Sequence, residues 1–346
     1  MTSARRAAEA GDRAARGRLF SLFERVFLVG GLILFFYLLH RLGAATVKDN
    51  LQLVGWGVLL IIAQEILAYL ANALGWFTAF PKPRHGLKLS SVLIARIVGD
   101  AVNYVTPTAG LGGEFIRARL LRDEVRSSRV VASVTVAKLS QVVGQILFIV
   151  IGLILILDDI PLTPNARRGL FFGLCVLSAL VAILMWLQRR GMFSPIWAFA
   201  ERLGIGDRAP DLAGQIRRLD EEVRRFHLDS TSQFLLSVLF FFCGWALGIV
   251  EVYLILWLLE VPVTVELALK IEVLSVAFDG IFFFVPAKLG TQEAGKVLIF
   301  RTLGLDPAIG LSFGILRHIR ELSWSLIGLL TLWWHNLTRA GRRRST

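Results

Sequence analysis

The sequence predicts an all-α polytopic membrane protein with six full transmembrane helices and two oppositely oriented, broken helical hairpins. Apolar residues make up 55% of the 346 residues and charged residues only 18%, against roughly 25% charged residues in a soluble domain. The apolar residues also gather in runs close to the ~20 residues that a helix needs to cross a bilayer. This composition disfavours a soluble enzyme, a disordered chain and a secreted disulfide scaffold.

The expected organisation is one membrane domain between two basic ends. We expect a basic cytoplasmic segment over residues 1–19, the membrane domain over 20–335 and a basic tail over 336–346. A basic start before an apolar run also describes a signal peptide, but this run is long and a poor cleavage site follows it, so we expect a retained first helix. The expected full spans are Phe20–His40, Leu51–Phe80, Val130–Leu157, Leu170–Leu187, Phe234–Leu259 and Leu311–Trp334.

A polar stretch over residues 188–231 separates the fourth and fifth spans. Five of its apolar residues recur at steps of four and three, which places them on one helical face. These residues are Leu212, Ile216, Leu219, Val223 and Phe226. Several arginines lie off that face, so the predicted cytoplasmic helix could rest on the headgroups of an anionic leaflet or pack on the rest of the protein.

Lysine and arginine are distributed unevenly between the loops. If the N-terminus is cytoplasmic and each broken hairpin returns to the side where it began, 23 of these residues near helix ends lie inside and five lie outside. Basic residues favour cytoplasmic loops, so we expect the N- and C-termini inside. The net charge of +12 therefore indicates an anionic membrane surface as a partner, and we expect no nucleic acid.

The chain aligns with itself at an offset of 179 residues, with copies over about 51–157 and 230–336. The aligned polar pairs are Asp100 with Asp279, Glu114 with Glu293, Arg117 with Lys296, Arg122 with Arg301, Lys138 with Arg317, and Asn72 with Glu251. Three full spans begin between the starts of the two copies, and this odd number makes the copies enter the membrane from opposite sides. Inverted repeats whose interrupted helices meet near the midplane build transport sites.

The two interrupted segments, 90–121 and 266–301, supply the expected site. Val92–Thr106 is too short to cross a bilayer comfortably, and a proline ends a helix because it lacks an amide donor. Non-helical backbone at membrane depth is tolerated only beside protein or a wet cavity, so the second helix of each hairpin should begin at a cavity and favour an anion there. The residues of the breaks are Pro107, Gly112, Gly113, Pro286 and Gly290.

Charged residues inside a membrane are costly, so each requires a partner or a function. We expect four bases to neutralise a phosphate headgroup, and two glutamates to exchange protons or to pair with these bases when the site is empty. The bases are Arg117, Lys296, Lys138 and Arg317, and the glutamates are Glu114 and Glu293. Five further charges are expected to be structural or proton-coupling: Asp100, Asp279, Glu251, Arg320 and Glu321. The alternative for the whole set is ion pairs that hold the broken helices in place.

No motif indicates a metal, a cofactor or a catalytic residue. The sequence has no HExxH, no Walker lysine motif and no CxxC pair, and Gly110-Leu-Gly112-Gly113 lacks the spacing of a dinucleotide loop. We therefore expect a transporter without cofactors rather than an enzyme. His318 is the one histidine among the embedded charges, and we expect it to be a hydrogen-bonded core residue rather than a proton carrier.

Two motifs resemble those of a known family. They are Gly-Asp-Ala-Val-Asn-Tyr-Val-Thr-Pro-Thr-Ala-Gly-Leu-Gly-Gly-Glu-Phe-Ile-Arg at 99–117 and Val-Pro-Ala-Lys-Leu-Gly-Thr-Gln-Glu-Ala-Gly at 285–295. Over most of 20–335 the chain resembles the lysylphosphatidylglycerol synthase transmembrane family of flippase-like proteins, here without the soluble aminoacyl-transferring domain. In the second motif Ala287 and Lys288 stand where the family commonly has glycines, which adds a positive charge.

The resemblance implies movement of a lipid or polyprenyl-linked substrate between leaflets. By motif position it implies roles for Pro107, Gly112, Gly113, Glu114, Arg117, Pro286, Gly290 and Glu293. We therefore expect a translocase of the bacterial inner membrane for an anionic phospholipid or a polyprenyl phosphate, served by a separate lipid-synthesising enzyme. The alternatives are a membrane-embedded enzyme or accessory factor of isoprenoid, hopanoid or phospholipid metabolism, and a scaffold that recruits partners through 188–231.

Overall fold

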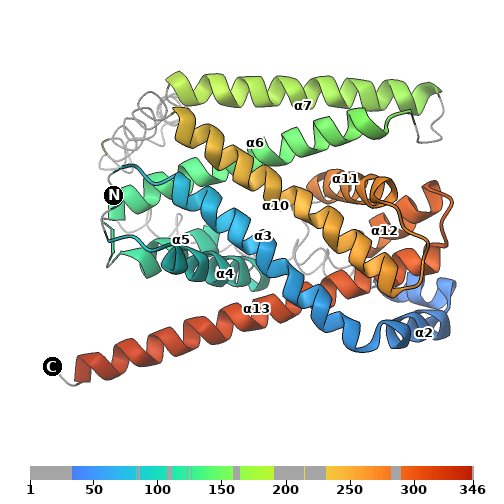
Figure 1. The fold of residues 1–346 in the computed structure, drawn as a ribbon, viewed down its shortest axis with the longest axis horizontal. Helices are drawn as coiled ribbons and strands as arrows, with labels where there is room; N and C mark the ends of the chain where they lie inside the picture. The colour runs from blue at the N-terminus through green and yellow to red at the C-terminus, as the bar shows by residue number, and fades with distance from the viewer. Residues whose placement is uncertain are drawn as a thin grey trace, which may run out of the picture.

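The computed structural model consists of helices joined by short loops over the residues that it describes (Figure 1). These residues are 33–82, 84, 86–106, 111–122, 124–125, 127–158, 164–190, 214, 231–281 and 290–344. The five apolar residues of the expected amphipathic face, the prolines Pro107 and Pro286, and the basic segment 1–19 lie outside the described residues.

The described chain opens with a short helix over Ile33–Leu42, and ten longer helices follow. In chain order they are α2 (Ala44–Val54), α3 (Val58–Thr78), α4 (Leu89–Val105), α5 (Leu111–Leu121), α6 (Ser127–Ile156), α7 (Pro164–Arg190), α10 (Thr231–Leu258), α11 (Val265–Ile281), α12 (Thr291–Thr302) and α13 (Pro307–Arg344). The breaks expected within 90–121 and 266–301 therefore fall between α4 and α5 and between α11 and α12.

The predicted span over Leu51–Phe80 overlaps Ala44–Thr78, a helical segment long and apolar enough to cross a membrane, but a single turn at Gly55–Gly57 separates α2 from α3 inside it. Gly55 has a φ of 47° and a ψ of −125°, a conformation that glycine adopts far more readily than other residues. The chain therefore changes direction before α3 begins. Hydropathy gives no sign of this break because the residues on both sides of it are apolar.

Three segments of the described chain are long and apolar enough to cross a membrane. They are Ala44–Thr78, Arg129–Ile156 and Thr231–Leu258, and each overlaps one of the predicted spans. The predicted spans Leu170–Leu187 and Leu311–Trp334 lie within the long helices α7 and α13. The protein is therefore a polytopic membrane protein, whereas the number of six full spans remains a prediction.

The antiparallel pair of α3 and α10 forms the centre of the fold, where the two helices run side by side (Figure 1). Gly57 at the start of α3 lies against Leu258 at the end of α10, and Gly75 near the other end of α3 lies against Phe241. The Ser237 hydroxyl donates to the Gly75 carbonyl at 2.7 Å. Small residues let membrane helices approach closely, and the two glycines provide that approach at both ends of the pair.

Helices α4 and α5 form a hairpin that returns to the end of the molecule where it began. The Ser91 hydroxyl near the start of α4 donates to the Glu124 carboxylate beyond α5 at 2.5 Å, and the Lys88 amide donates to the same carboxylate at 3.3 Å. Arg84 in the preceding loop donates to Gln233 at 2.8 Å. The open end of this hairpin therefore lies beside the end of α3 and the start of α10.

Helices α11 and α12 form the second hairpin, at the other end of the α3–α10 pair. Ala268 and Ile271 of α11 share one apolar cluster with Phe300 of α12. The same cluster contains Val54 at the end of α2 and Leu259 just after α10. The two hairpins therefore enter the fold from opposite ends.

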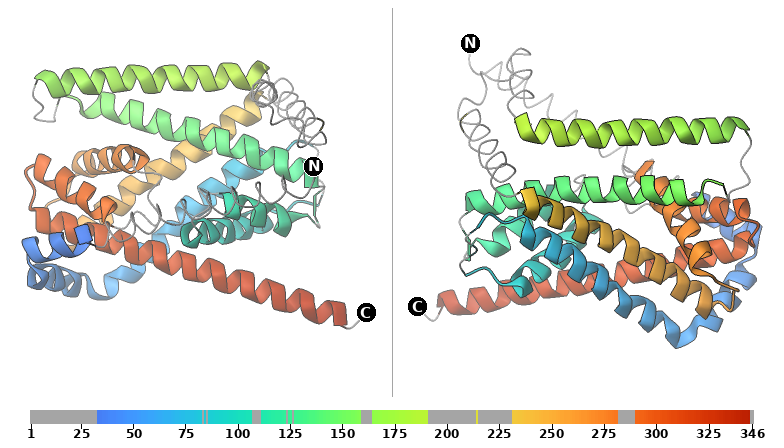
Figure 2. Two further views of the ribbon diagram at one scale, coloured as in Figure 1. Left: turned by 180° about the vertical axis from the view of Figure 1, so that it is seen from behind. Right: turned by 45° about the horizontal axis from the view of Figure 1, so that its top comes forward.

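Two long helices, α6 and α13, each pack on both hairpins. Helix α13 packs on α12 and also on α4 of the first hairpin, while α6 packs on α5 and also on α11 of the second hairpin. Helix α7 packs on α6 and lies at the edge of the molecule (Figure 2). Each long helix thus contacts both hairpins.

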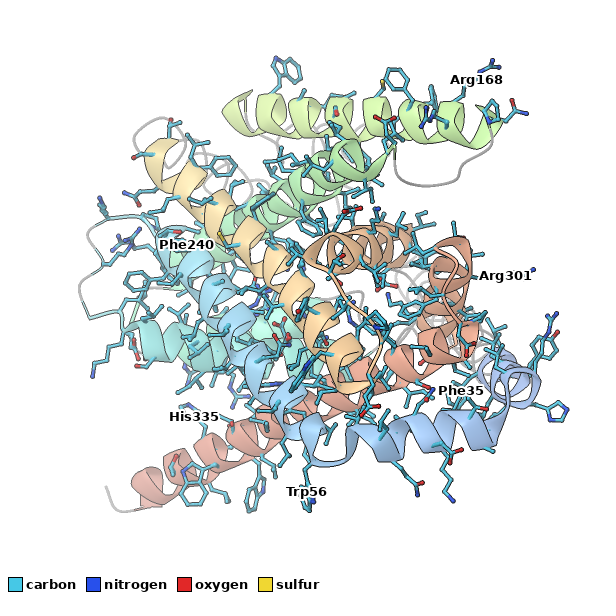
Figure 3. The ribbon with its side chains drawn as sticks, turned by 45° about the vertical axis from the view of Figure 1, so that its right-hand side comes forward. Phe35, Trp56, Arg168, Phe240, Arg301 and His335 are labelled. Carbon is cyan, nitrogen blue, oxygen red and sulfur yellow. The ribbon has the colours of Figure 1, made fainter. Side chains whose placement is uncertain are left out.

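Large apolar side chains cover much of the outer surface. On α7, Phe172 is 71% exposed and Phe171 is 63% exposed. Trp56, at the turn before α3, is 87% exposed and points away from the neighbouring helices (Figure 3). A soluble monomer rarely exposes apolar surface on this scale, and a bilayer accounts for it.

Replacing Gly75 with alanine should destabilise the central helix pair. A Cβ at Gly75 would lie 2.9 Å from the buried ring of Phe241, and overpacking a core costs about 1–3 kcal/mol. The matched control is Gly173→Ala on α7, where a Cβ would meet nothing within 4 Å. Thermal unfolding of the purified proteins in detergent should show a lower midpoint for Gly75→Ala only, and equal midpoints would contradict this packing.

Candidate functional site

A cluster of charged residues joins the two helices of the first hairpin. Arg117 of α5 pairs with Asp100 of α4 and, at 2.6 Å, with Glu114 one turn earlier. Arg96, one turn before Asp100 on α4, lies 3.0 Å from the same carboxylate. Both arginines are buried. The Asp100 carboxylate therefore compensates two guanidinium groups that have been removed from water.

Two glycines make this cluster geometrically possible. The Arg117 side chain passes over Gly99, where a Cβ would lie 2.4 Å from its Nε atom. A Cβ on Gly113 would lie 2.1 Å from the Gly99 carbonyl oxygen, and the Gly113 amide donates to Asn103 at 2.7 Å. Gly113 is thus the point where α5 touches α4. Gly112 lies beside it in the first turn of α5.

The second hairpin has the same pairing at the aligned positions. Lys296 of α12 lies 3.0 Å from Asp279 of α11, and the base follows the aspartate by 17 residues, as Arg117 follows Asp100. The Lys296 side chain has no exposed surface. Each hairpin is therefore closed by one aspartate from its first helix and one base from its second helix.

Glu293, in the first turn of α12, is held on both carboxylate oxygens. The Nδ1 atom of His318 lies 2.6 Å from one oxygen, and the Gly290 amide donates to the other at 2.8 Å. Gly290 has a φ of 76°, in the left-handed region that favours glycine. His318 is buried, and its role as a hydrogen-bonded core residue rather than a proton carrier stays a prediction. Gly290 is the residue that positions its amide for Glu293.

A third cluster lies where α13 meets α3, α10 and α11. Arg317 lies 3.0 Å from Glu251 and also pairs with Glu272. Arg320, one turn later, lies 2.5 Å from Glu65 and 2.9 Å from Glu251. Glu251 thus bridges the two arginines, and the cluster ties α13 to three other helices.

A cavity of about 80 Å³ opens between α3, α4 and α13. Its polar lining comprises Glu65, Tyr69, Asp100, Tyr104, Arg320 and Glu321. Glu321 lies 3.5 Å from Arg320 and receives a 3.4 Å contact from the Gln292 amide of α12. The cavity connects the first cluster, through Asp100, with the third cluster, through Arg320.

Lys138 of α6 differs from the other bases of these clusters in its exposure. Its side chain is 53% exposed, whereas the side chains of the other five bases are at most 13% exposed. These five are Arg96, Arg117, Lys296, Arg317 and Arg320. The Lys138 ammonium lies 3.7 Å from the Glu114 carboxylate, which Arg117 approaches more closely. An accessible base is therefore present at the first hairpin, while its aligned partner Arg317 is buried.

The predicted charged residues fall into three clusters, one in each hairpin and one around Arg317 and Arg320, so Arg117 and Lys296 lie in different clusters. Sequence reasoning missed Arg96, Glu65 and Glu272, each of which carries an ion pair. A signal existed for Glu65, because it is the only charged residue in α3. The four-residue spacing of Arg96 and Asp100 also indicates an ion pair on one helix face.

Comparison with known families matches residues 24–329 to the family described as "Lysylphosphatidylglycerol synthase TM region". The match covers both hairpins, all three clusters and the cavity. Comparison with curated proteins and comparison with solved structures each gave no match.

The Lys296–Asp279 pair should dominate the stability of the second hairpin. Removing one partner of a buried ion pair leaves the other charge uncompensated and costs about 3–5 kcal/mol, so Asp279→Asn should destabilise strongly. Adding Lys296→Met should recover much of the loss. Glu266→Gln, which breaks an exposed pair with Lys270, is the control and should cost less than about 1 kcal/mol. Thermal unfolding in detergent measures all four proteins, and a double variant no more stable than Asp279→Asn would contradict the pairing.

Proposed function

The chain belongs to the lysylphosphatidylglycerol synthase transmembrane family, and on this premise we propose that it is a lipid translocase. Its substrate is an anionic phospholipid or a polyprenyl-phosphate-linked lipid, which it moves between the leaflets of the bacterial inner membrane. The phosphate headgroup passes through the charged interior, while the hydrocarbon chains stay in the bilayer. The lipid leaves chemically unchanged, so the protein acts as a transporter rather than an enzyme.

The single observation that carries this proposal is the half-exposed Lys138. It lies eleven residues after the start of α6 at Ser127, which is about 16 Å along a helix and close to half of a ~30 Å hydrocarbon core. A lysine at the centre of a membrane helix costs roughly 2.5–3.5 kcal/mol. A lipid phosphate beside the ammonium would offset that cost.

In the first cluster, carboxylates occupy the positions beside the bases that a lipid phosphate would take. Arg117 is paired with Asp100 and Glu114, and Lys138 shares Glu114 with it. An arriving phosphate can replace Glu114 between these two bases, since a guanidinium and an ammonium both bind phosphate well. Glu114 then accepts a proton or turns to another base, and Glu293 has the corresponding role in the second hairpin.

We interpret the fold as an inverted repeat that opens its two hairpins alternately. The antiparallel α3–α10 pair, the entry of the hairpins from opposite ends and the aligned aspartate–base pairs support this interpretation. The two copies also differ in the exposure of one aligned base. Lys138 is accessible, while Arg317 at the aligned position is buried between Glu251 and Glu272. The first hairpin then represents the open site and the second hairpin the closed one.

The distribution of basic residues supports a cytoplasmic location for both termini. The loops after α3 and α5 and the end of α13 lie at one end of the molecule, while α2 and the end of α12 lie at the other (Figure 1). The first end carries Arg84, Arg129 and the C-terminal arginines. Arg168 and Arg301 point outward at the second end (Figure 3). The open first hairpin would therefore receive lipid from the cytoplasmic leaflet, where a separate enzyme makes it.

Substituting Lys138 tests the proposed role directly. In liposomes of phosphatidylcholine and phosphatidylglycerol, we expect Lys138→Ala to slow the movement of fluorescently labelled phosphatidylglycerol by at least about tenfold, the effect of one lost charged contact of ~1.4 kcal/mol. Lys138→Arg should retain most of the activity because it keeps the charge. Lys48→Ala removes an exposed base of α2 and serves as the control.

Equal rates for Lys138→Ala and Lys48→Ala would exclude the proposed phosphate contact. The enzyme alternative is distinguished by mass spectrometry of the recovered lipid. A translocase changes the leaflet in which the labelled lipid is found and leaves its mass unchanged, whereas a lipid-modifying enzyme or accessory factor of isoprenoid or hopanoid metabolism would be indicated by a product of altered mass.

A further inference from the structure

We propose that the cavity between α3, α4 and α13 is a proton-exchange site in which Glu321 carries the proton, and that this proton drives lipid movement. The inference rests on the proposed function and adds its energy source. It depends on the geometry of the cavity, on the balance of charges around it and on one buried amide.

Glu321 has the weakest charge compensation among the carboxylates that line the cavity. Glu65 lies 2.5 Å from Arg320, and Asp100 pairs with two arginines of the first hairpin. Glu321 lies 3.5 Å from the Nη2 atom of Arg320, whose Nη1 atom is already shared by two other glutamates. Its side chain is 26% exposed, and it lines the cavity. A proton can therefore reach Glu321, the carboxylate of the cavity with the weakest charge compensation.

The described residues of the three clusters contain more carboxylates than bases. The bases are Arg96, Arg117, Lys138, Lys296, Arg317 and Arg320. The carboxylates are Glu65, Asp100, Glu114, Glu251, Glu272, Asp279, Glu293 and Glu321. Even a protonated His318 leaves one negative charge uncompensated within this set. Uncompensated charge in a membrane interior is costly, and binding of a proton removes it.

A buried amide beside Glu321 also requires a hydrogen-bond donor. Gln292 is only 2% exposed, and its Oε1 atom has no hydrogen-bond partner among the described residues. Its Nε2 atom donates to the Glu321 carboxylate at 3.4 Å, and rotation of the amide would exchange the positions of Nε2 and Oε1. A protonated Glu321 has an O–H group that can donate to this oxygen, whereas an ionised Glu321 has none.

The groups around Glu321 come from four helices. Helix α3 contributes Glu65 and Tyr69, α4 contributes Asp100 and Tyr104, α13 contributes Arg320, and Glu251 of α10 lies next to Arg320. Further arginines compensate two of these carboxylates: Arg96 and Arg117 pair with Asp100, and Arg317 pairs with Glu251. Glu321 is therefore the carboxylate of the cavity that lies farthest from its nearest base.

Asp100 provides the physical link between lipid and proton, because it lines the cavity and also pairs with Arg117. A phosphate that replaces Glu114 beside Arg117 also competes with Asp100 for the guanidinium. The Asp100 charge is then less compensated, and proton uptake at Glu321 becomes more favourable. Lipid binding and proton binding therefore support each other, as reciprocal linkage between two sites requires.

The test uses the full-length protein in liposomes of phosphatidylcholine and phosphatidylglycerol, with an imposed pH gradient and the membrane potential clamped by potassium and valinomycin. If one proton moves with each lipid, the ratio of labelled phosphatidylglycerol between the leaflets should shift about tenfold for each unit of the gradient. Glu321→Gln, which mimics the protonated side chain, should move lipid but leave this ratio unchanged. Glu260→Gln, outside the cavity, is the control and should behave as the wild type.

The outcomes separate the two proposals. Wild-type protein that moves lipid without any shift of the ratio would overturn proton coupling and leave the translocase intact. A wild type that moves no lipid would refute the translocase proposal. Protonation of Glu321 is then tested independently by labelling the wild type with dicyclohexylcarbodiimide. Modification of Glu321 that decreases as the pH rises would support a protonated Glu321, and its absence at every pH would refute it.

Discussion

The compensation of charge inside hydrocarbon is the constraint on which the rest of this structure depends. A single unpaired charge at the centre of a membrane costs several kcal/mol, yet both hairpins carry aspartate, glutamate and basic residues. The structure resolves this cost by pairing each aspartate of a first hairpin helix with a base of the second, as in Asp100 with Arg117 and Asp279 with Lys296. The same pairs that close the hairpins also keep positive charge available at depth.

Helix packing determines which of these charged side chains are exposed. The glycines at 57 and 75 bring α3 and α10 together, and this pair holds the two hairpins at opposite ends of the molecule. Helices α6 and α13 each contact both hairpins and join the two halves of the molecule. The two halves nevertheless differ, because Lys138 is exposed and Arg317 at the aligned position is buried. The proposed translocase would use this combination of matched charges and unequal exposure.

Much of the fold follows from the sequence because apolar runs and charged residues give strong signals in a membrane protein. The aligned positions at an offset of 179 residues identified Asp100, Arg117, Asp279 and Lys296 before any contact was known, and these residues do form pairs. The two hairpins also end close to the predicted limits. The hairpins and their charged residues could be predicted because hydropathy and the cost of a buried charge depend on single residues and their spacing along the chain.

The partners of α13 and the turn at Gly55 did not follow from the sequence. Glu65, Glu251 and Glu272 come from three different helices to meet Arg317 and Arg320, and no local pattern specifies how separate helices rotate against one another. The alignment relates Arg117 and Lys296 as equivalent positions and says nothing of the distance between them, so the binding of one phosphate by both residues stays a prediction. The exposure of Lys138 likewise depends on which face α6 turns towards its neighbours.

The most direct measurement is electron cryomicroscopy of the protein in nanodiscs that contain phosphatidylglycerol or a polyprenyl phosphate. A lipid whose phosphate lies within hydrogen-bonding distance of Lys138 and Arg117, with its chains in the bilayer, is the predicted result. Acyl chains alone beside Lys138, with Arg117 still paired to Asp100 and Glu114 and no phosphate below the headgroup level, would contradict passage of a lipid headgroup through the first hairpin.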